Sequence, residues 1–250
     1  MEKEQNVEQE IFKDYMHNQF AKIEGFDFND LTKLKDKLDK EVNLDIYPTY
    51  KEFFPKNNKE LKILELGSGF GRFPFFCQRL GYKNFVGVDL SREGIEICRK
   101  LFPEFTFVEK DFNDYFSSSS EKFDIIFLAH VLEHVNKAGI PVFLENIKQR
   151  LNEGGVAIIT VPNASAYFGA TAGRYIDYTH EIAFTAESLE EILLVKGFKI
   201  VKSKNIEINV ALYKKIIHSL VKSIFEMFIQ IMGYKRERIY TQAFLTVAKK

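Results

Sequence analysis

A glycine-rich turn between two short apolar segments constrains this chain most. The segment Lys62-Ile-Leu-Glu-Leu-Gly-Ser-Gly-Phe-Gly-Arg72 begins with an apolar run typical of a buried parallel strand and then leads into a helix predicted to open near Phe73. Gly67, Gly69 and Gly71 allow tight turning and let a ligand approach bare backbone amides. Twenty positions after Gly69, a second apolar strand ends in Asp89, which is placed to accept hydrogen bonds from a ribose diol. The pattern predicts a nucleoside ligand at the carboxyl ends of parallel strands.

The spacing of the glycines argues against a dinucleotide-binding fold. That fold needs G-x-G-x-x-G, whose third glycine permits close packing of helix and strand. Here the spacing is G-x-G-x-G, and Arg72 stands where the dinucleotide pattern needs its third glycine. Glu65, two residues before the first glycine, suits the amino-acid end of a zwitterionic ligand better than a pyrophosphate.

The apolar pattern after the turn alternates between strand and helix. Strands are predicted near 61–66, 83–89, 104–109, 123–129 and 155–161, and helices near 72–80, 92–101, 137–151 and 186–196. This alternation predicts an α/β fold with a doubly wound, mostly parallel sheet. Phe198–Val201 and Gln242–Ala248 are predicted as two further strands.

The first part of the chain precedes the sheet. Residues 1–58 are predicted to form an N-terminal helical cap or substrate region, and residues 59–250 the ligand-binding domain. Helices are expected near 7–24 and 31–38, and Pro48 and Pro55 are expected to bracket a connector. The cap also offers a contact for a homodimer.

Composition excludes several classes of protein. With 35 basic and 35 acidic residues the formal charge is zero, so nothing global points to nucleic acid. Cys77 and Cys98 fall on apolar helix faces without metal spacing, as packed free thiols of a reducing compartment do. The polar start lacks a signal-peptide core, and no charge-free apolar run of about 18 residues exists. These features predict a cytoplasmic protein.

The chain resembles class I S-adenosylmethionine-dependent methyltransferases, whose first motif is E-x-G-x-G-x-G. The likeness covers roughly residues 60–200 and continues through Asp111-Phe112, Asp124–Ala129, Leu132-Glu-His-Val135 and Leu151–Val156. It implies a Rossmann-like sheet of seven strands closed by an antiparallel pair, with S-adenosyl-L-methionine as cofactor. A nucleotide fold without methyl transfer is the alternative.

The resemblance implies a role for each residue of the cofactor site. The turn faces the methionine part, Glu65 its amino group, Asp89 the ribose and Leu90 the adenine face. Asp111 would accept from the adenine N6 amine, although it could instead cap a helix starting at Phe112. The implied cofactor-binding set is Glu65, Gly67, Ser68, Gly69, Gly71, Asp89, Leu90, Asp111, Phe112, Ala129 and His130. The last two are expected to flank the methylthio group.

Methyl transfer from a sulfonium requires the protein to align the acceptor, exclude water and remove the proton of a hydroxyl acceptor. Histidine is the natural base near neutral pH. His130 and His134 follow the fourth strand, and His180 lies in the long segment 162–184 after the fifth. His17 and His218 are interpreted as ordinary surface or helix residues.

Two mechanisms compete, beside a purely structural role for the histidines. In the first, His180 or His134 is a metal-free base oriented by Asp177 or Glu133. In the second, some of these residues and His130 hold a metal, as the similar E-x-x-E-H arrangement of quinone and small-RNA methyltransferases implies. His130 replaces the first glutamate, which suits Zn²⁺, Fe²⁺ or Mn²⁺ better than Mg²⁺. We favour the metal-free base, with His180, His134 and Asp177 as catalytic residues.

The acceptor is indicated by the segment Arg174–Thr185, together with Ser188–Ile192 and Gly197-Phe198. It is similar to methyltransferases of bacterial surface polysaccharides, such as capsule and O-antigen. This implies a sugar hydroxyl or phosphorylated precursor as acceptor, with Arg174 and Tyr178 binding it. Arg174 could equally form a surface ion pair. The rival is a quinone or other small-molecule methyltransferase, with or without a metal. A non-catalytic binding protein that keeps the cofactor fold is disfavoured, because the glycines, Asp89 and Asp111 are intact.

An amphipathic helix is predicted near 210–232, inserted before the last strand. Its polar positions follow a tight stripe at spacings of three and four, and its apolar face is wide. One alternative packs that face on the chain's own domain or a partner subunit. The other lays it on a membrane surface, helped by Lys214, Lys215 and Lys222, which would make the protein peripheral to the inner membrane face.

Overall fold

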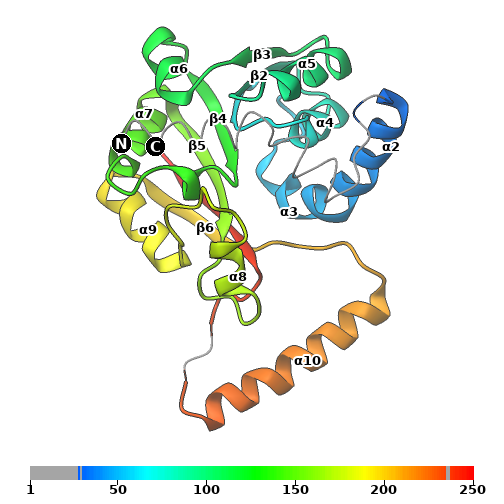
Figure 1. Ribbon diagram of the computed structural model, residues 1–250, viewed down its shortest axis with the longest axis vertical. Helices are drawn as coiled ribbons and strands as arrows, with labels where there is room; N and C mark the ends of the chain where they lie inside the picture. The colour runs from blue at the N-terminus through cyan, green and yellow to red at the C-terminus, as the bar shows by residue number, and fades with distance from the viewer. Residues whose placement is uncertain (1–27, 29, 235–236) are drawn as a thin grey trace.

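A seven-stranded sheet is the centre of the described part of the molecule (Figure 1). The computed structural model describes residue 28, residues 30–234 and residues 237–250, so the predicted helix near 7–24 and His17 lie outside it. The strands follow the order β3-β2-β1-β4-β5-β7-β6. Their bounds are β1 Lys62–Leu66, β2 Asn84–Asp89, β3 Thr106–Glu109, β4 Phe123–Ala129, β5 Leu151–Pro162, β6 Lys199–Asn205 and β7 Ala243–Lys249.

The sheet is mostly parallel, as predicted. β1 pairs in parallel with β2 on one side and β4 on the other, and β4 pairs in parallel with β5. β7 pairs antiparallel with both β5 and β6. This is the class I methyltransferase fold that the sequence predicted.

Helices cover both faces of the sheet (Figure 1). Their bounds are α2 Leu31–Glu41, α3 Tyr47–Tyr50, α4 Arg72–Arg79, α5 Arg92–Leu101, α6 Phe112–Ser118, α7 Ile140–Arg150, α8 Ala170–Tyr175, α9 Ala186–Val195 and α10 Leu212–Ile231. The short helix α8 was not predicted, and α6 was considered only as the helix that Asp111 could cap. Cys77 in α4 and Cys98 in α5 are buried free thiols, as the sequence predicted.

The alternation of side chains along each strand divides the apolar interior into two clusters. Ile63, Phe127 and Ile158 point into the cluster beneath α2, α4 and α5. Their neighbours Leu64 and Leu128 point into the cluster beneath α6, α7 and α9. The structure is therefore three-layered, with helix, sheet and helix, and the carboxyl ends of β1, β2 and β4 share one edge.

The segment 30–54 shares the first of these clusters. Tyr50 packs edge-on against Phe73 and Phe127, and its hydroxyl lies 2.8 Å from Oγ1 of Thr160 in β5. Arg72, at the start of α4, is 3.1 Å from Glu41 and 3.0 Å from Asp45. The predicted domain division at residue 58 stays a prediction, but this segment and α4 bury one common surface.

The predicted connector between Pro48 and Pro55 is helical in its first part. A π-helical turn, η2 (Val42–Ile46), joins α2 to α3, and a 3₁₀ turn, η3 (Lys51–Phe53), follows. Pro48 stands at the start of α3, where a missing N–H is tolerated. The connector that the sequence predicted between the two prolines therefore contains a short helix and a 3₁₀ turn, which the sequence analysis did not expect.

Gly71 is a glycine whose replacement the fold tolerates poorly. It precedes α4 with φ of 102°, and an added Cβ would lie 2.5 Å from Cε2 of Phe102. Gly81 also has positive φ, 81°, but an added Cβ meets nothing within 4 Å.

We expect Gly71→Ala to lower the free energy of unfolding by about 3 kcal/mol, because strain and a buried clash add. Gly81→Ala introduces backbone strain without a clash and is expected to lower the free energy of unfolding by about 1 kcal/mol. Urea unfolding followed by circular dichroism measures both. Equal losses in the two variants would contradict the clash.

Candidate active site

The glycine turn after β1 is held by hydrogen bonds to the end of β2. The backbone N–H groups of Gly67 and Ser68 donate to the Val88 carbonyl, at 2.8 and 3.3 Å. Gly69 N–H donates to Oδ2 of Asp89 at 2.8 Å, and Oδ1 of Asp89 accepts from Ser91 N–H at 2.7 Å. Asp89 thus fixes the turn before any ligand arrives, and burial raises the pKa of its carboxyl.

Gly69 is the most open position of this turn. Its φ is 50°, and a Cβ built there would meet nothing within 4 Å. A ligand can therefore approach the backbone closely at this point. Leu90, beside Asp89, is 48% exposed and offers an apolar surface at the same edge.

Two buried polar groups near the turn have no hydrogen-bond partner among the described residues. They are Oε2 of Glu65 and the hydroxyl of Ser68, and both side chains are 4% exposed. Burial, and then the charge of Asp89, raise the pKa of the Glu65 carboxyl well above its usual range. Unsatisfied buried groups are costly, so their presence here favours a ligand that pairs with them.

Asp111 acts as the N-cap of α6, since its Oδ1 accepts from the Asn113 N–H at 2.8 Å. The cap and the predicted adenine contact do not exclude each other, because a carboxylate has two oxygens. Asp111 and Phe112 follow β3, and Ala129 ends β4. The adenine and methylthio assignments stay predictions.

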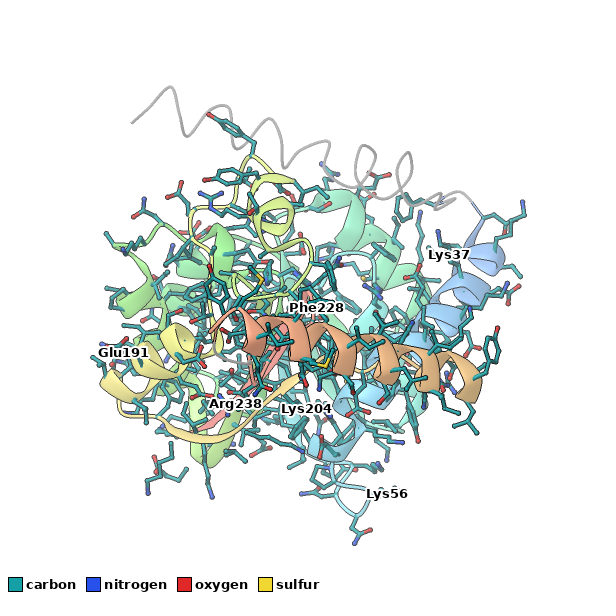
Figure 2. The ribbon with its side chains drawn as sticks, turned by 90° about the horizontal axis from the view of Figure 1, so that it is seen from below. Lys37, Lys56, Glu191, Lys204, Phe228 and Arg238 are labelled. Carbon is teal, nitrogen blue, oxygen red and sulfur yellow. The ribbon has the colours of Figure 1, made fainter. Side chains whose placement is uncertain are left out.

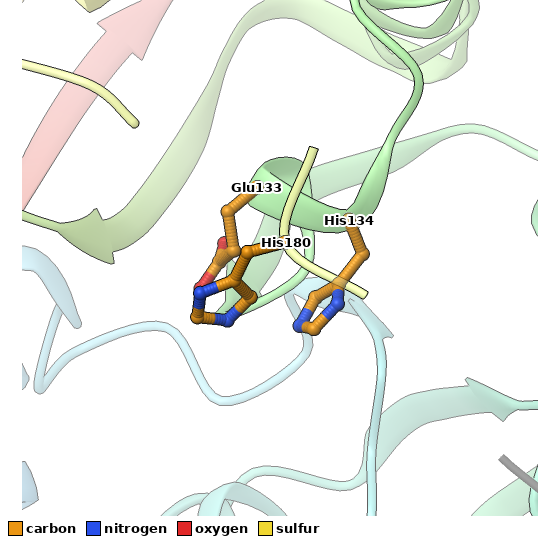
Figure 3. A group of neighbouring side chains, drawn as sticks. All are labelled: Glu133, His134 and His180. Atoms are coloured by element: carbon orange, nitrogen blue, oxygen red, sulfur yellow. The ribbon is translucent and has the colours of Figure 1, made fainter. Parts of the chain in front are cut away.

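Glu133, His134 and His180 come together after β4 (Figure 3). One potential ligand atom from each lies within 4.8 Å of the others. The rings of His134 and His180 meet nearly edge to face, with centroids 4.7 Å apart. The backbone N–H of Glu181 donates to the Glu133 carbonyl at 2.8 Å, which anchors the segment after β5 here.

The hydrogen bonds define the tautomers of both rings. Nδ1 of His180 lies 3.0 Å from the Gly173 carbonyl, which can only accept. Nδ1 of His134 lies 2.8 Å from Oγ1 of Thr179, whose own proton goes to Asp177 at 2.7 Å. Both Nδ1 atoms therefore donate, and Nε2 is the lone-pair nitrogen of each neutral ring.

Burial lowers the pKa of His134, and this effect outweighs the nearby charge of Glu133, which acts to raise that pKa. The pKa of Asp177 is lowered because hydrogen bonds from the Thr179 side chain and backbone outweigh its own burial. A neutral imidazole and an ionised carboxylate are the forms that proton abstraction needs.

His130 is the only non-glycine residue of the described chain with positive φ, 57°. Its backbone N–H donates to the Thr160 carbonyl at 2.9 Å, and its Nδ1 lies 3.2 Å from Oε1 of Glu133. This left-handed conformation at the end of β4 turns the chain into the short helix η4 (Leu132–His134) and is typical of functional sites.

The two predicted substrate-binding residues lie on the segment leading to His180. Arg174 donates to the Glu181 carbonyl at 3.2 Å, and its guanidinium carbon lies 5.2 Å from the ring centroid of Tyr175. Among the described residues these partners are a carbonyl and a ring, and no carboxylate pairs with the guanidinium. Tyr178 is 80% exposed.

Sequence reasoning missed Thr179, which links Asp177 to His134. The signal was present, because Asp-x-Thr is a typical turn in which Oδ1 of the aspartate accepts from the N–H two residues on, here at 2.9 Å. It also missed the buried pair Tyr50–Thr160. No local pattern predicts this contact, because 110 positions separate the two residues.

The chain belongs to the methyltransferase domain family, whose model matches residues 38–203. The family and the fold together make it a class I S-adenosylmethionine-dependent methyltransferase, with S-adenosylmethionine as its cofactor. The match begins within α2, so it crosses the predicted boundary at residue 58.

Individual relatives share a modest part of their sequence with this chain. The ribosomal protein L11 methyltransferase of Dictyoglomus turgidum is 30% identical over 112 residues, 44% of this chain. The chain matches 36% of the length of that curated relative.

Solved structures share the fold over most of their length. A SAM-dependent methyltransferase from Archaeoglobus fulgidus is 22% identical, with a TM-score of 0.60 over 88% of this chain and 95% of that one. Magnesium protoporphyrin IX methyltransferase from Synechocystis PCC 6803, with bound SAH, is 14% identical, with a TM-score of 0.60 over 98% and 99% of the two chains. At these identities the likeness concerns the fold alone.

The residues present fit S-adenosylmethionine. Glu65 offers a buried carboxylate oxygen for an ammonium group, the open turn at Gly69 offers close backbone approach, and Leu90 offers an apolar surface. Which atom of the cofactor each residue contacts stays a prediction.

Cofactor binding is expected to release a proton from Glu65, because an ammonium group beside this carboxyl lowers its raised pKa. Affinity should therefore increase as pH rises toward the pKa of Glu65 in the free protein. Calorimetric titration in buffers of different ionisation enthalpy counts the protons. Glu65→Gln should bind the cofactor without releasing a proton. Asp114→Asn, at an exposed position of α6, should release as many protons as the wild type. Equal proton release by the wild type and both variants would contradict the role of Glu65.

Proposed function

We propose that the chain transfers a methyl group from S-adenosylmethionine to a hydroxyl oxygen of a sugar or phosphorylated precursor in bacterial surface-polysaccharide synthesis. The observation that supports an oxygen acceptor is the cluster of Glu133, His134 and His180. It follows β4, and β4 pairs directly with β1, which leads into the glycine turn. We propose a cytoplasmic location, in keeping with two buried free thiols.

The cluster supplies what a hydroxyl acceptor needs. S-adenosylmethionine, when bound, supplies a methyl group activated by its sulfonium. His180 acts as the base or positions the acceptor. Its Nδ1–H donates to the Gly173 carbonyl, so Nε2 is the nitrogen that can accept a proton. Asp177 orients His134 through Thr179. The hydroxyl proton would go to an imidazole as the acceptor oxygen bonds to the methyl carbon, the carbon–sulfur bond breaking so that the sulfonium leaves as a neutral thioether.

The segment before His180 supports a polar, ring-shaped acceptor. Arg174 is suited to a phosphate or carboxylate. Tyr175 and Tyr178 are 75% and 80% exposed, and aromatic faces of this kind line ligand sites. Two of the solved structures that share this fold are named for other small molecules, a didemethyltoxoflavin and magnesium protoporphyrin IX, so the fold itself does not select the acceptor.

A quinone or other small-molecule methyltransferase with a metal is the second candidate. The specific observation in its favour is Oε2 of Glu133, which is buried and has no hydrogen-bond partner among the described residues. Two imidazoles and one carboxylate form a set that suits Fe²⁺, Mn²⁺ or Zn²⁺. In that case His180 would be a ligand and not a base.

We expect His180→Ala to bind the cofactor as wild type does while methyl transfer falls roughly 10²–10⁴-fold, the loss typical of removing a general base. His218→Ala, on the exposed helix α10, is the matched control and should keep full activity. Unchanged transfer in His180→Ala would contradict the role of the cluster. Loss of wild-type activity with a chelator, restored by one metal, would instead favour the metal candidate.

The acceptor class is tested by transfer of radiolabelled methyl groups into nucleotide sugars, lipid-linked glycans, quinones and RNA. We expect label on an oxygen of a phosphorylated sugar or glycan precursor, with a higher KM in Arg174→Ala because a phosphate contact is lost. Exclusive methylation of a quinone or of RNA would overturn the glycan assignment and leave the methyltransferase class intact.

A further inference from the structure

Helix α10 (Leu212–Ile231) has no buried residue (Figure 1). Its apolar side chains gather on one side, which we call the outer face and define by Tyr213, Ile217, Leu220, Ile224, Phe228 and Ile231. These side chains are 51 to 72% exposed. Their spacing of three and four residues places them on one stripe of the helix. Figure 2 shows α10 in front of the rest of the chain, with Phe228 labelled.

The opposite side of α10 rests on the chain's own domain. Phe225 packs against Tyr167 and Phe168, with ring centroids 5.1 and 4.9 Å apart. Nζ of Lys222 lies 4.2 Å from the ring centroid of Tyr240. Half-buried residues of α10 lie at 222, 225, 226 and 229, again a single stripe. Packing on the domain therefore uses one stripe and directs the outer face away from it.

The charge of α10 is predominantly positive. The helix contains Lys214, Lys215 and Lys222 but one acid, Glu226, which lies 3.5 Å from Lys222. Within the described part of the chain, Lys214 and Lys215 form no ion pair. Tyr213 and Tyr234 stand near the two ends of the helix, 60% and 67% exposed. Cationic residues beside a wide apolar stripe, with aromatic residues at the ends, are typical of helices that lie in a membrane interface.

We infer that the outer face of α10 binds the surface of an anionic lipid bilayer, with the helix lying along it. Anionic headgroups complement the lysines, and the apolar stripe enters the boundary between headgroups and acyl chains. A second copy of the helix fits less well, because it supplies no acid for Lys214 and Lys215: the one acid of the helix, Glu226, already lies 3.5 Å from Lys222. No described helix combines the length and apolar character needed to pass through a bilayer.

The opposite side of α10 contacts the segment that leads to His180. Phe168, Tyr175 and Ile176 are 62%, 75% and 75% exposed on the same segment that supports α10 through Tyr167 and Phe168. A helix bound to lipid would hold this segment near the headgroups. Resting on the proposed function, the inference narrows the acceptor to a precursor attached to lipid.

The test is flotation of the full chain with vesicles of phosphatidylcholine, with or without phosphatidylglycerol. We expect binding to the anionic vesicles that weakens with salt. Leu220→Glu with Ile224→Glu should reduce binding roughly tenfold or more, because both charges enter the apolar stripe. Ser219→Glu with Ser223→Glu, which adds the same charge on the polar side, should reduce it much less. Cofactor titration and circular dichroism establish that each variant is folded.

Two outcomes would overturn the inference. One is absence of wild-type binding to anionic vesicles, or equal losses in the two double variants. The other is a wild-type dimer in light scattering that the Leu220→Glu, Ile224→Glu variant alone dissolves, which would assign the outer face to a second copy. Vesicle binding needs no acceptor, so its failure is separate from failure of methyl transfer.

Discussion

The hydrogen bond from the backbone of Gly69 to Asp89, 2.8 Å long, is the interaction on which the candidate active site depends most. It joins the turn after β1 to the end of the neighbouring strand β2. The Gly69 carbonyl is held on its other side, because Sγ of Cys98 lies 3.5 Å away and an added Cβ at Gly94 would come within 2.6 Å. The turn is thus shaped by packing of α5 before a ligand binds. Preorganisation of this kind lowers the entropy cost of binding.

The same sheet edge concentrates polar groups that the protein itself does not satisfy. Glu65 at the end of β1 and Glu133 after β4 each have a buried carboxylate oxygen without a partner among the described residues. Their surroundings differ, because the pKa of Glu65 is raised by burial and by Asp89, whereas Glu133 lies beside imidazole rings. The first environment favours a cation from the ligand. The second suits proton transfer or a metal, so the two carboxylates on one edge are suited to different chemistry.

Sequence predicted most of the sheet because its strands are short apolar runs bounded by glycine, proline or charge. The bounds of β4 and α5 were predicted to the residue, at 123–129 and 92–101. The sequence analysis missed the helical turns within the connector between Pro48 and Pro55, because the π-helical turn that leads into them leaves no mark in local propensity. It also failed at Thr179 and Thr160, whose roles arise from contacts between distant segments. The sequence singled out His134 and His180 by their chemistry rather than by their periodicity, and the structure brings both beside Glu133, while their catalytic role stays a prediction.

Helix α10 and the segment that leads to His180 are held in place by the same residues. Tyr167 packs against Phe225 of α10 and stacks on Tyr240 at a centroid distance of 5.7 Å. Asn163, where this segment begins, donates to the Ile239 and Thr241 carbonyls at 3.1 and 2.9 Å and so ties the segment to the chain entering β7. The same segment ends at His180, whose backbone neighbours bind Glu133. The residues that support α10 therefore belong to the same segment that brings His180 to Glu133, so the position of the inserted helix and the position of the histidine cluster are mechanically linked.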